Sequence, residues 1–277
     1  MRIAQISDPH VSADGLPVHG LVDTDAALAR VVAAVNALDP QPDLVVVTGD
    51  LAHDGDAGAT ARAHDALAAL RAPVLVCAGN HDCGDAVRAA FGPFPGDAGE
   101  GGVVYAVEGH PLRLIALDAS TGDPLHAALP AAQVAWLAAR LAEEPERPVL
   151  IFLHHPPFDT GIGWLDSMGI AQGRHEMGTI IAAHKGVAAI LCGHLHRPMR
   201  GAWYGVPVLA APSVMDRVTF TGLRPDGSPV AAVTAPPGFV LHRWSAEGGL
   251  VSELRFLDGY AETWLAARPD PAAAPKD

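Results

Sequence analysis

The chain has 277 residues, of which 49% are hydrophobic and 18% charged, and its formal net charge is −13. This composition excludes a disordered chain and fits one large α/β domain with a sizeable core. The negative charge argues against nucleic acid and anionic membranes as partners. Three cysteines without regular spacing do not suggest a disulfide framework, and neither a signal peptide nor a membrane span is recognisable. We therefore expect a cytoplasmic protein.

Short apolar runs rich in Val, Ile and Leu recur along the chain, and such continuous runs are typical of strands buried on both faces. The expected strands are 3–6, 44–47, 74–77, 112–117, 149–153, 188–192 and 206–209. Ala-rich segments with a 3.6-residue period predict helices at 25–38, 60–70, 130–141 and 177–184. Asp23 or Thr24 can cap the first of these helices. The alternation of strands and helices predicts an α/β layered fold with much parallel pairing.

The character of the chain changes after Pro212. Residues 213–238 are rich in Pro, Gly and Thr, and a hairpin of two strands is expected after them, at 239–244 and 250–256. The expected regions are a catalytic domain over 1–212, a C-terminal cap and dimerisation region over 213–262, and a flexible tail over 263–277. The C-terminal strands are too few to bury a core of their own, so they must pack on the main domain or on another chain.

Five polar segments each follow one of the expected buried strands. They are Asp8-Pro9-His10, Gly49-Asp50, Gly79-Asn80-His81-Asp82, His154-His155-Pro156 and Gly193-His194-Leu195-His196. Ligands bind at the carboxyl ends of strands in open α/β sheets, so these segments can meet along one edge. Each segment alone could be an ordinary turn or helix cap. Their joint occurrence after buried strands indicates a shared site.

The residue types in these segments indicate a metal centre. Imidazole nitrogens, carboxylate oxygens and an amide oxygen suit Mn, Fe, Zn or Co, and the lack of Cys argues against a structural zinc site. Seven candidate ligands are too many for one ion but suit two ions if one carboxylate bridges them. Two such ions form the clamp of hydrolytic phosphate enzymes, in which one ion helps to generate a hydroxide and both neutralise charge on the phosphoryl oxygens.

In order and composition, the five segments resemble the signature of the calcineurin-like metallophosphoesterases, over roughly residues 1–212. Within that superfamily the chain is most similar to bacterial glycerophosphodiesterases and class III cyclic-nucleotide phosphodiesterases, on residues 6–10, 154–157 and 241–243. Pro9 departs from that group, which usually has Thr there, but position 9 is not an expected ligand. The resemblance implies a four-layer sandwich of two β-sheets flanked by helices, with a small C-terminal cap and dimerisation appendage.

The resemblance also implies a role for each site residue. The first metal would be bound by Asp8, His10 and His196. The second would be bound by Asn80, His154 and His194, and Asp50 would bridge both. The catalytic residue facing the substrate would be His81. The substrate contacts would be Asn80, His81 and His196.

Three further histidine roles are weighed from the residues themselves. His81 either contacts the phosphoryl oxygen or protonates the leaving alkoxide, or it is a solvated loop residue held by Asp82. His155, adjacent to a ligand, is expected to support the site rather than to contact substrate. His19 lies in the loop 12–22, which either overhangs the pocket and contacts substrate or stays at the surface.

The sequence favours hydrolysis of small phosphodiesters, either cyclic nucleotides such as cyclic AMP or glycerophosphodiesters, by attack of a metal-bound hydroxide. A diester carries one negative charge and needs no Arg cage, and the motif segments are poor in Arg. The alternative is a phosphomonoesterase acting on nucleotides or other small phosphates. A scaffold without metals is disfavoured because every expected ligand position holds a coordinating residue. A homodimer or higher homo-oligomer is expected through the appendage, with a monomer as the alternative.

Overall fold

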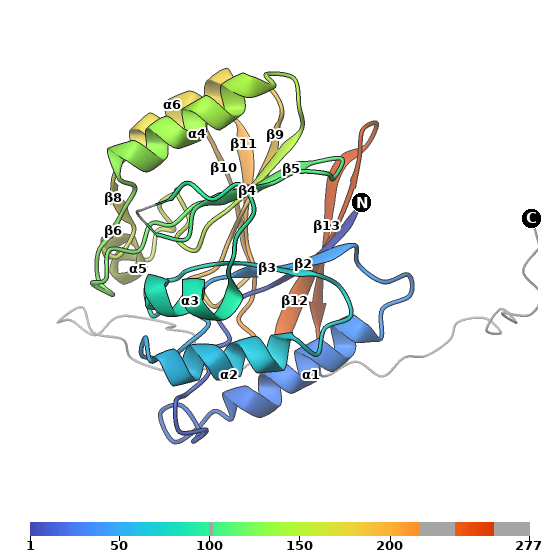
Figure 1. Ribbon diagram of the computed structural model, residues 1–277, viewed down its shortest axis with the longest axis vertical. Helices are drawn as coiled ribbons and strands as arrows, with labels where there is room; N and C mark the ends of the chain where they lie inside the picture. Colours follow the sequence, from blue (N-terminus) through green and yellow to red (C-terminus); the bar gives the residue numbers. More distant parts are fainter. Residues whose placement is uncertain (100–101, 216–235, 258–277) are drawn as a thin grey trace, which may run out of the picture.

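The computed structural model describes residues 1–99, 102–215 and 236–257. Two β-sheets lie between two layers of helices, so the molecule has four layers (Figure 1). The expectation of an α/β sandwich of two sheets flanked by helices is confirmed.

The first sheet combines early and late parts of the chain in the order β13-β12-β1-β2-β3. Its strands are β1 (Arg2–Ile6), β2 (Leu44–Thr48), β3 (Val74–Cys77), β12 (Gly238–Ser245) and β13 (Gly249–Phe256). β1, β2 and β3 are parallel, whereas β12 is antiparallel to β1, with Ala4 opposite Leu241. Every residue of β2 is buried because the sheet is covered on both faces, which explains its unbroken apolar run.

The second sheet has the order β10-β11-β9-β7-β5-β4. Its strands are β4 (Tyr105–Val107), β5 (Arg113–Ala116), β7 (Val149–Phe152), β9 (Val187–Cys192), β10 (Met199–Trp203) and β11 (Val206–Ala210). The four inner strands are parallel, and the edge strands β4 and β10 are antiparallel to their neighbours. A small separate sheet pairs β6 (Ala127–Ala128) with β8 (Ile170–Gln172).

Helices cover the outer face of each sheet (Figure 1). The first sheet is covered by α1 (Thr24–Asn36), α2 (Ala57–Leu67) and α3 (Gly84–Phe91), and the second by α4 (Ala131–Glu143) and α6 (Arg174–Ala183). The short α5 (Gly163–Ser167) follows β7. Asp23 caps α1, because its carboxylate accepts a hydrogen bond from the backbone N–H of Ala26 at 2.9 Å. No helix among the described residues has both the length and the apolar character needed to cross a bilayer.

The expected C-terminal strands exist and pack on the main domain, whereas a separate C-terminal appendage is not confirmed. β12 and β13 extend the first sheet beside β1, and Phe239 and Leu241 belong to the main hydrophobic core. These strands pair there because the edge of β1 opposite β2 offers unpaired backbone groups. Residues 216–235 and 258–262 of the expected cap, and the tail at 263–277, lie outside the described residues. The domain boundary at residue 212 stays a prediction.

Candidate metal centre

The five polar segments meet at one end of the two sheets. The first sheet supplies the segments after β1, β2 and β3, and the second supplies those after β7 and β9. Backbone hydrogen bonds join the segments pairwise, from Asp8 N–H to Gly49 C=O at 3.1 Å and from Gly193 N–H to His154 C=O at 2.9 Å. The backbone N–H of His194 donates to Asp8 Oδ1 at 3.0 Å and so links the two sheets.

The first group of donors is Asp8, His10, Asp50 and His196, whose ligand atoms all lie within 4.8 Å of one another. Nε2 of His10 lies 3.0 Å from Nε2 of His196 and 3.3 Å from Oδ2 of Asp50. Nε2 of His196 lies 3.4 Å from Oδ1 of Asp8. The structure thus brings the three residues expected at the first metal together with the expected bridge.

The second group of donors shares Asp50 with the first. Nε2 of His154 lies 3.2 Å from Oδ2 of Asp50 and 3.0 Å from Oδ1 of Asn80. The same amide oxygen lies 3.0 Å from Nδ1 of His194. One carboxylate oxygen, Asp50 Oδ2, therefore stands between His10 on one side and His154 on the other.

The nitrogen and oxygen donor atoms of this second group point toward one another, which is the arrangement that a metal ion requires. His154 donates Nδ1–H to the carbonyl of Thr48 at 2.8 Å, which places Nε2 between two oxygen atoms, where it can bind either a proton or a metal ion. Asn80 donates its amide N–H to Pro124 C=O at 3.1 Å, and this bond turns Oδ1 inward. In the first group, Oδ2 of Asp8 is buried and has no hydrogen-bond partner. Buried N and O atoms that converge in this way favour a cation between them, and this set of donors fits Mn, Fe, Zn or Co.

The charges of the centre are strongly coupled. Burial opposes ionisation of Asp50, yet His154 and His10 outweigh it and hold the pKa of Asp50 well below its usual value. Burial likewise disfavours the His154 imidazolium, but the Asp50 carboxylate outweighs it and raises the pKa of His154 to about 10. Burial lowers the pKa of His194 to about 3 and that of His10 well below 6.5. The centre therefore favours positive charge beside Asp50 and keeps His10 and His194 neutral, the form in which an imidazole can bind a metal.

Five of the seven expected ligands have left-handed backbone conformations. The φ angles are +52° at Asp8, +46° at His10, +53° at Asp50, +69° at His194 and +50° at His196. Each such residue costs on the order of 1 kcal/mol or more and persists only where the surroundings hold it. This concentration of strain at one place is typical of a functional site.

Two motif glycines allow the segments to approach closely. A Cβ at Gly79 would collide with the backbone N and the carboxylate of Asp50, and a Cβ at Gly193 would collide with Thr48 C=O and Ser7 Oγ. Because a backbone atom is hit in both cases, any larger residue would push the ligand segments apart.

Asp82 ties two of the segments together, a role that the sequence did not indicate. Its carboxylate accepts hydrogen bonds from the backbone N–H groups of Leu51 at 3.1 Å, Ala52 at 2.9 Å and Gly79 at 2.8 Å. Burial, reinforced by the charge of Asp50, raises the pKa of Asp82 to about 7. The position of Asp82 in the third polar segment could have indicated a role in the site, but the sequence suggested only that Asp82 holds His81.

A hollow of about 390 Å³ opens beside the donors and is the natural place for a substrate. Its polar lining comes from His10, His19, Asp50, His53, Asn80, His81, His194 and His196. Its apolar lining comes from Pro124, Leu125, Trp164, Leu165, Met168, Leu195 and Met215. Among the described residues that line it there is no Arg or Lys. The loop 12–22 reaches this hollow through His19.

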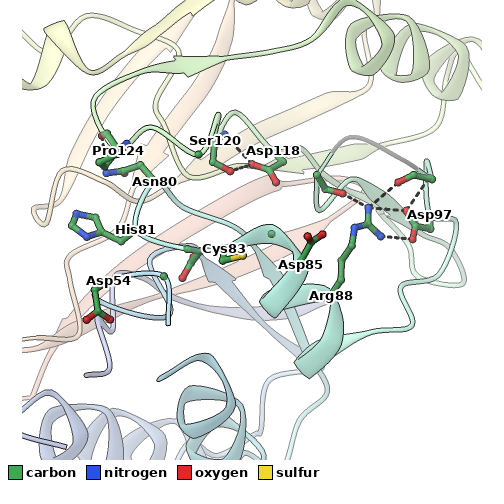
Figure 2. A pocket seen from close by; sticks show the side chains of 16 residues that line it. Asp54, Asn80, His81, Cys83, Asp85, Arg88, Asp97, Asp118, Ser120 and Pro124 are labelled. Atoms are coloured by element: carbon green, nitrogen blue, oxygen red, sulfur yellow. Dashed lines mark hydrogen bonds and ion pairs between the residues drawn. The ribbon is translucent and has the colours of Figure 1, made fainter. Parts of the chain in front are cut away.

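Two of the weighed histidines differ in their access to this hollow. His155 is only 1% exposed, lies with its ring 4.6 Å from the ring of His194, and does not line the hollow. His155 therefore packs against an expected ligand, whereas His19 is exposed and lines the hollow. A second hollow of about 980 Å³ shares Asn80, His81 and Pro124 with the first (Figure 2). Arg88 is the one Lys or Arg side chain among the described residues that line this second hollow, and it forms an ion pair with Asp97 at 2.6 Å.

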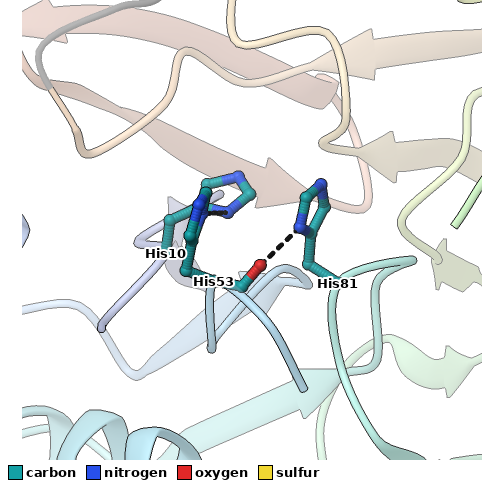
Figure 3. Close-up of side chains that lie close together, drawn as sticks. All are labelled: His10, His53 and His81. Atoms are coloured by element: carbon teal, nitrogen blue, oxygen red, sulfur yellow. Dashed lines mark hydrogen bonds between the residues drawn. The ribbon is translucent and has the colours of Figure 1, made fainter. Parts of the chain in front are cut away.

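His81 is oriented by the backbone of His53, not by Asp82. Nδ1 of His81 lies 2.5 Å from the carbonyl oxygen of His53 and donates to it, which leaves Nε2 available to the hollow (Figure 3). The His53 ring stacks on His81 with centroids 5.6 Å apart, and its Nδ1 lies 3.5 Å from Nδ1 of His10. No pattern in the sequence singled out His53, because its contact with His81 uses the main chain.

Comparison with known proteins places these features in a family. The family model described as "Calcineurin-like phosphoesterase" matches residues 1–198. The chain is 30% identical over 257 residues to a protein from Arcobacter nitrofigilis named probable glycerophosphodiester phosphodiesterase GpdQ, and the match covers 93% of each chain. It is 32% identical over 257 residues to 3',5'-cyclic adenosine monophosphate phosphodiesterase CpdA of Escherichia coli, covering 93% of this chain and 90% of that one.

The fold is also similar to that of solved structures. A dimetal phosphatase from Danio rerio superposes with a TM-score of 0.63 over 93% of this chain and 99% of the other, at 16% sequence identity. At that identity the similarity establishes the shared fold of the two chains.

Proposed function

The chain belongs to the calcineurin-like phosphoesterase family, and on that premise we propose that it is a phosphodiesterase that uses two metal ions to hydrolyse small phosphodiesters. The proposed substrates are cyclic nucleotides such as cyclic AMP, or glycerophosphodiesters. The names of the two relatives support both substrate classes.

The position of Asp50 carries the proposal of two ions. Its Oδ2 atom is about equally far from Nε2 of His10, at 3.3 Å, and from Nε2 of His154, at 3.2 Å. Separate groups of donors lie on the two sides of this oxygen, which is the arrangement a bridging carboxylate needs. On one side Asp8, His10 and His196 would hold the first ion, and on the other Asn80, His154 and His194 would hold the second.

Two bound ions supply an activated water and neutralise charge on the phosphoryl group. The protein's own part in the reaction falls to His81. Held through Nδ1 by the carbonyl of His53, a protonated His81 presents Nε2–H to the hollow and donates that proton to the departing alkoxide. Asn80 and His196 line the same hollow and contact the phosphoryl oxygens of the substrate.

The lining of the 390 Å³ hollow favours a diester. A monoester dianion usually recruits bidentate Arg, and none lines the described part of this hollow. The wall formed by Trp164, Leu165 and Met168 can instead accommodate the organic group on the second ester bond.

A side-by-side rate comparison tests the proposal. Protein stripped with a chelator and reloaded with Mn²⁺ would be assayed on cyclic AMP, a glycerophosphodiester, an aryl diester and an aryl monoester, with bound metal measured in the same samples. We expect two ions per chain and a higher kcat/KM for the diesters. Preference for the aryl monoester would favour the monoesterase alternative, and a protein that binds no metal would contradict the proposal altogether.

We also propose a homodimer that uses the C-terminal strands. β13 is an edge strand of the first sheet, and it exposes Val251 by 52% and Leu254 by 40%. Apolar side chains on an unpaired edge favour association. Light scattering at micromolar concentration should give twice the chain mass, and Val251→Lys should reduce it. A monomeric mass for the unaltered protein would refute the dimer.

A further inference from the structure

A buried polar side chain on the last part of the first sheet is connected to the metal centre. His242 of β12 is 0% exposed, and its Nε2 lies 3.0 Å from Oε1 of Gln5 in β1, which is equally buried. Because the amide oxygen can only accept, Nε2 of His242 carries the proton. Nδ1 of His242 then accepts from the hydroxyl of Ser252 at 2.8 Å. The imidazole is fully hydrogen-bonded and holds Gln5 in one orientation.

Gln5 in turn joins both sheets at the strands that precede metal ligands. Its amide N–H groups donate to Thr48 Oγ1 at 3.1 Å and to the carbonyl of Cys192 at 2.9 Å. Thr48 is the last residue of β2, two positions before Asp50. Cys192 is the last residue of β9, two positions before His194.

The arm through Thr48 ends on a metal ligand. The Thr48 hydroxyl donates to Ser7 Oγ at 2.7 Å, and the Ser7 hydroxyl donates to the carbonyl of Thr48 at 3.2 Å. That carbonyl also accepts Nδ1–H of His154 at 2.8 Å, the bond that directs Nε2 of His154 at the second donor group. The hydrogen bonds from His242 through Gln5 and the two hydroxyls and the bond from His154 therefore end on the same acceptor, the Thr48 carbonyl. Hydrogen bonds connected in this way influence one another.

We propose that His242 is a positioning residue for the metal centre: by orienting Gln5, it fixes the Thr48 and Ser7 hydroxyls that hold the Thr48 carbonyl, and so aims His154 at the second ion. The proposal rests on the proposed function, because it takes His154 as a ligand. Partners beyond the ligands typically change metal affinity by about 10–100-fold when removed. β12 thus contributes to metal binding although none of its residues is a ligand.

Metal affinity and stability must be separated in the test. Mn²⁺ titration calorimetry on chelator-stripped protein and thermal unfolding of the metal-free protein would compare His242→Leu, His242→Gln and Leu241→Ala. Leu241 is the matched control, because it is buried beside His242 on the same strand but lies in the hydrophobic core. Gln at position 242 retains an Nε2 donor for Gln5.

We expect His242→Leu to weaken Mn²⁺ binding at the lower-affinity site by about 10–100-fold. His242→Gln should keep most of the affinity of the unaltered protein. Leu241→Ala should lower Tm without changing the affinity for Mn²⁺. Equal affinity in His242→Leu and the unaltered protein would overturn the proposal, as would an equal loss in Leu241→Ala. If His242→Leu fails to fold, Ser252→Ala removes the anchor of the ring, and unchanged affinity there would overturn it. Failure of the unaltered protein to bind Mn²⁺ would instead contradict the proposed function.

Discussion

Replacing His242 by Gln should make the metal-free protein more resistant to acid. Burial lowers the pKa of His242 from 6.5 to about 3, so the folded protein holds this imidazole neutral where the unfolded chain protonates it. Below pH 6.5 the unfolded state therefore binds more protons than the folded state. Stability falls as the pH falls through this range, and the loss is complete only near pH 3.

The size of the effect follows from the two pKa values. At about pH 4.5 an unfolded His242 is almost fully protonated and a folded one almost fully neutral, which costs the folded state roughly 2–3 kcal/mol. Gln does not titrate and keeps the donor to Gln5. The unaltered protein should therefore lose about that much more stability than His242→Gln between about pH 7 and about pH 4.5.

Urea unfolding in the presence of a chelator, at both pH values, would measure this difference. The other buried histidines are present in both proteins, so their contributions cancel in the comparison. His126→Gln makes the same chemical change at an exposed side chain and serves as the control. Parallel loss of stability with pH in the unaltered protein and in His242→Gln would refute the reasoning.

Three further changes test the centre itself. Asp50→Ala removes the shared ligand, so mass spectrometry should show less of both metal ions, and kcat should fall by orders of magnitude. The circular dichroism spectrum should stay the same. Two bound ions and normal turnover in this variant would contradict the assignment of Asp50 as the bridging ligand. His81→Ala should keep both metals and slow alkyl diesters more than nitrophenyl diesters, whose leaving group departs without a proton; equal losses in kcat would leave His81 a positioning group. Gly193→Ala should weaken metal binding and destabilise the fold by about 1–3 kcal/mol in urea, because the new methyl group hits the Thr48 carbonyl and Ser7. Gly84→Ala, where a methyl group meets nothing within 4 Å, is its control, and equal effects of the two changes would refute close approach as the cause.

The sequence predicted the ligand segments because their positions are local. Asp8, Asp50 and His154 each follow a run of buried apolar residues, and both the run and the polar residue after it are visible within about ten residues. The inner strands and the main helices were predictable for the same reason. β10, from Met199 to Trp203, was not, since its half-exposed residues show no continuous apolar run.

Contacts between distant segments were the part that the sequence did not reveal. The hairpin of β12 and β13 was predictable from its own residues, but its pairing with β1 depends on partners more than 200 positions away. His53 acts through its carbonyl group, and any residue type could supply that atom. Asp82 bonds to three backbone N–H groups, so neither its partners nor its role left a pattern of side chains.

The pairing of β1 with β12 has a consequence for how the protein is made. Asp8 and His10 are translated more than 200 residues before β12, so the strand before them stays without its antiparallel partner until residues 240–243 have been made. Contacts of such long sequence separation form late and slow the folding of a chain. The first sheet can therefore be completed only after synthesis has passed residue 243, and Asp8 and His10 gain their final support from a strand made long after them.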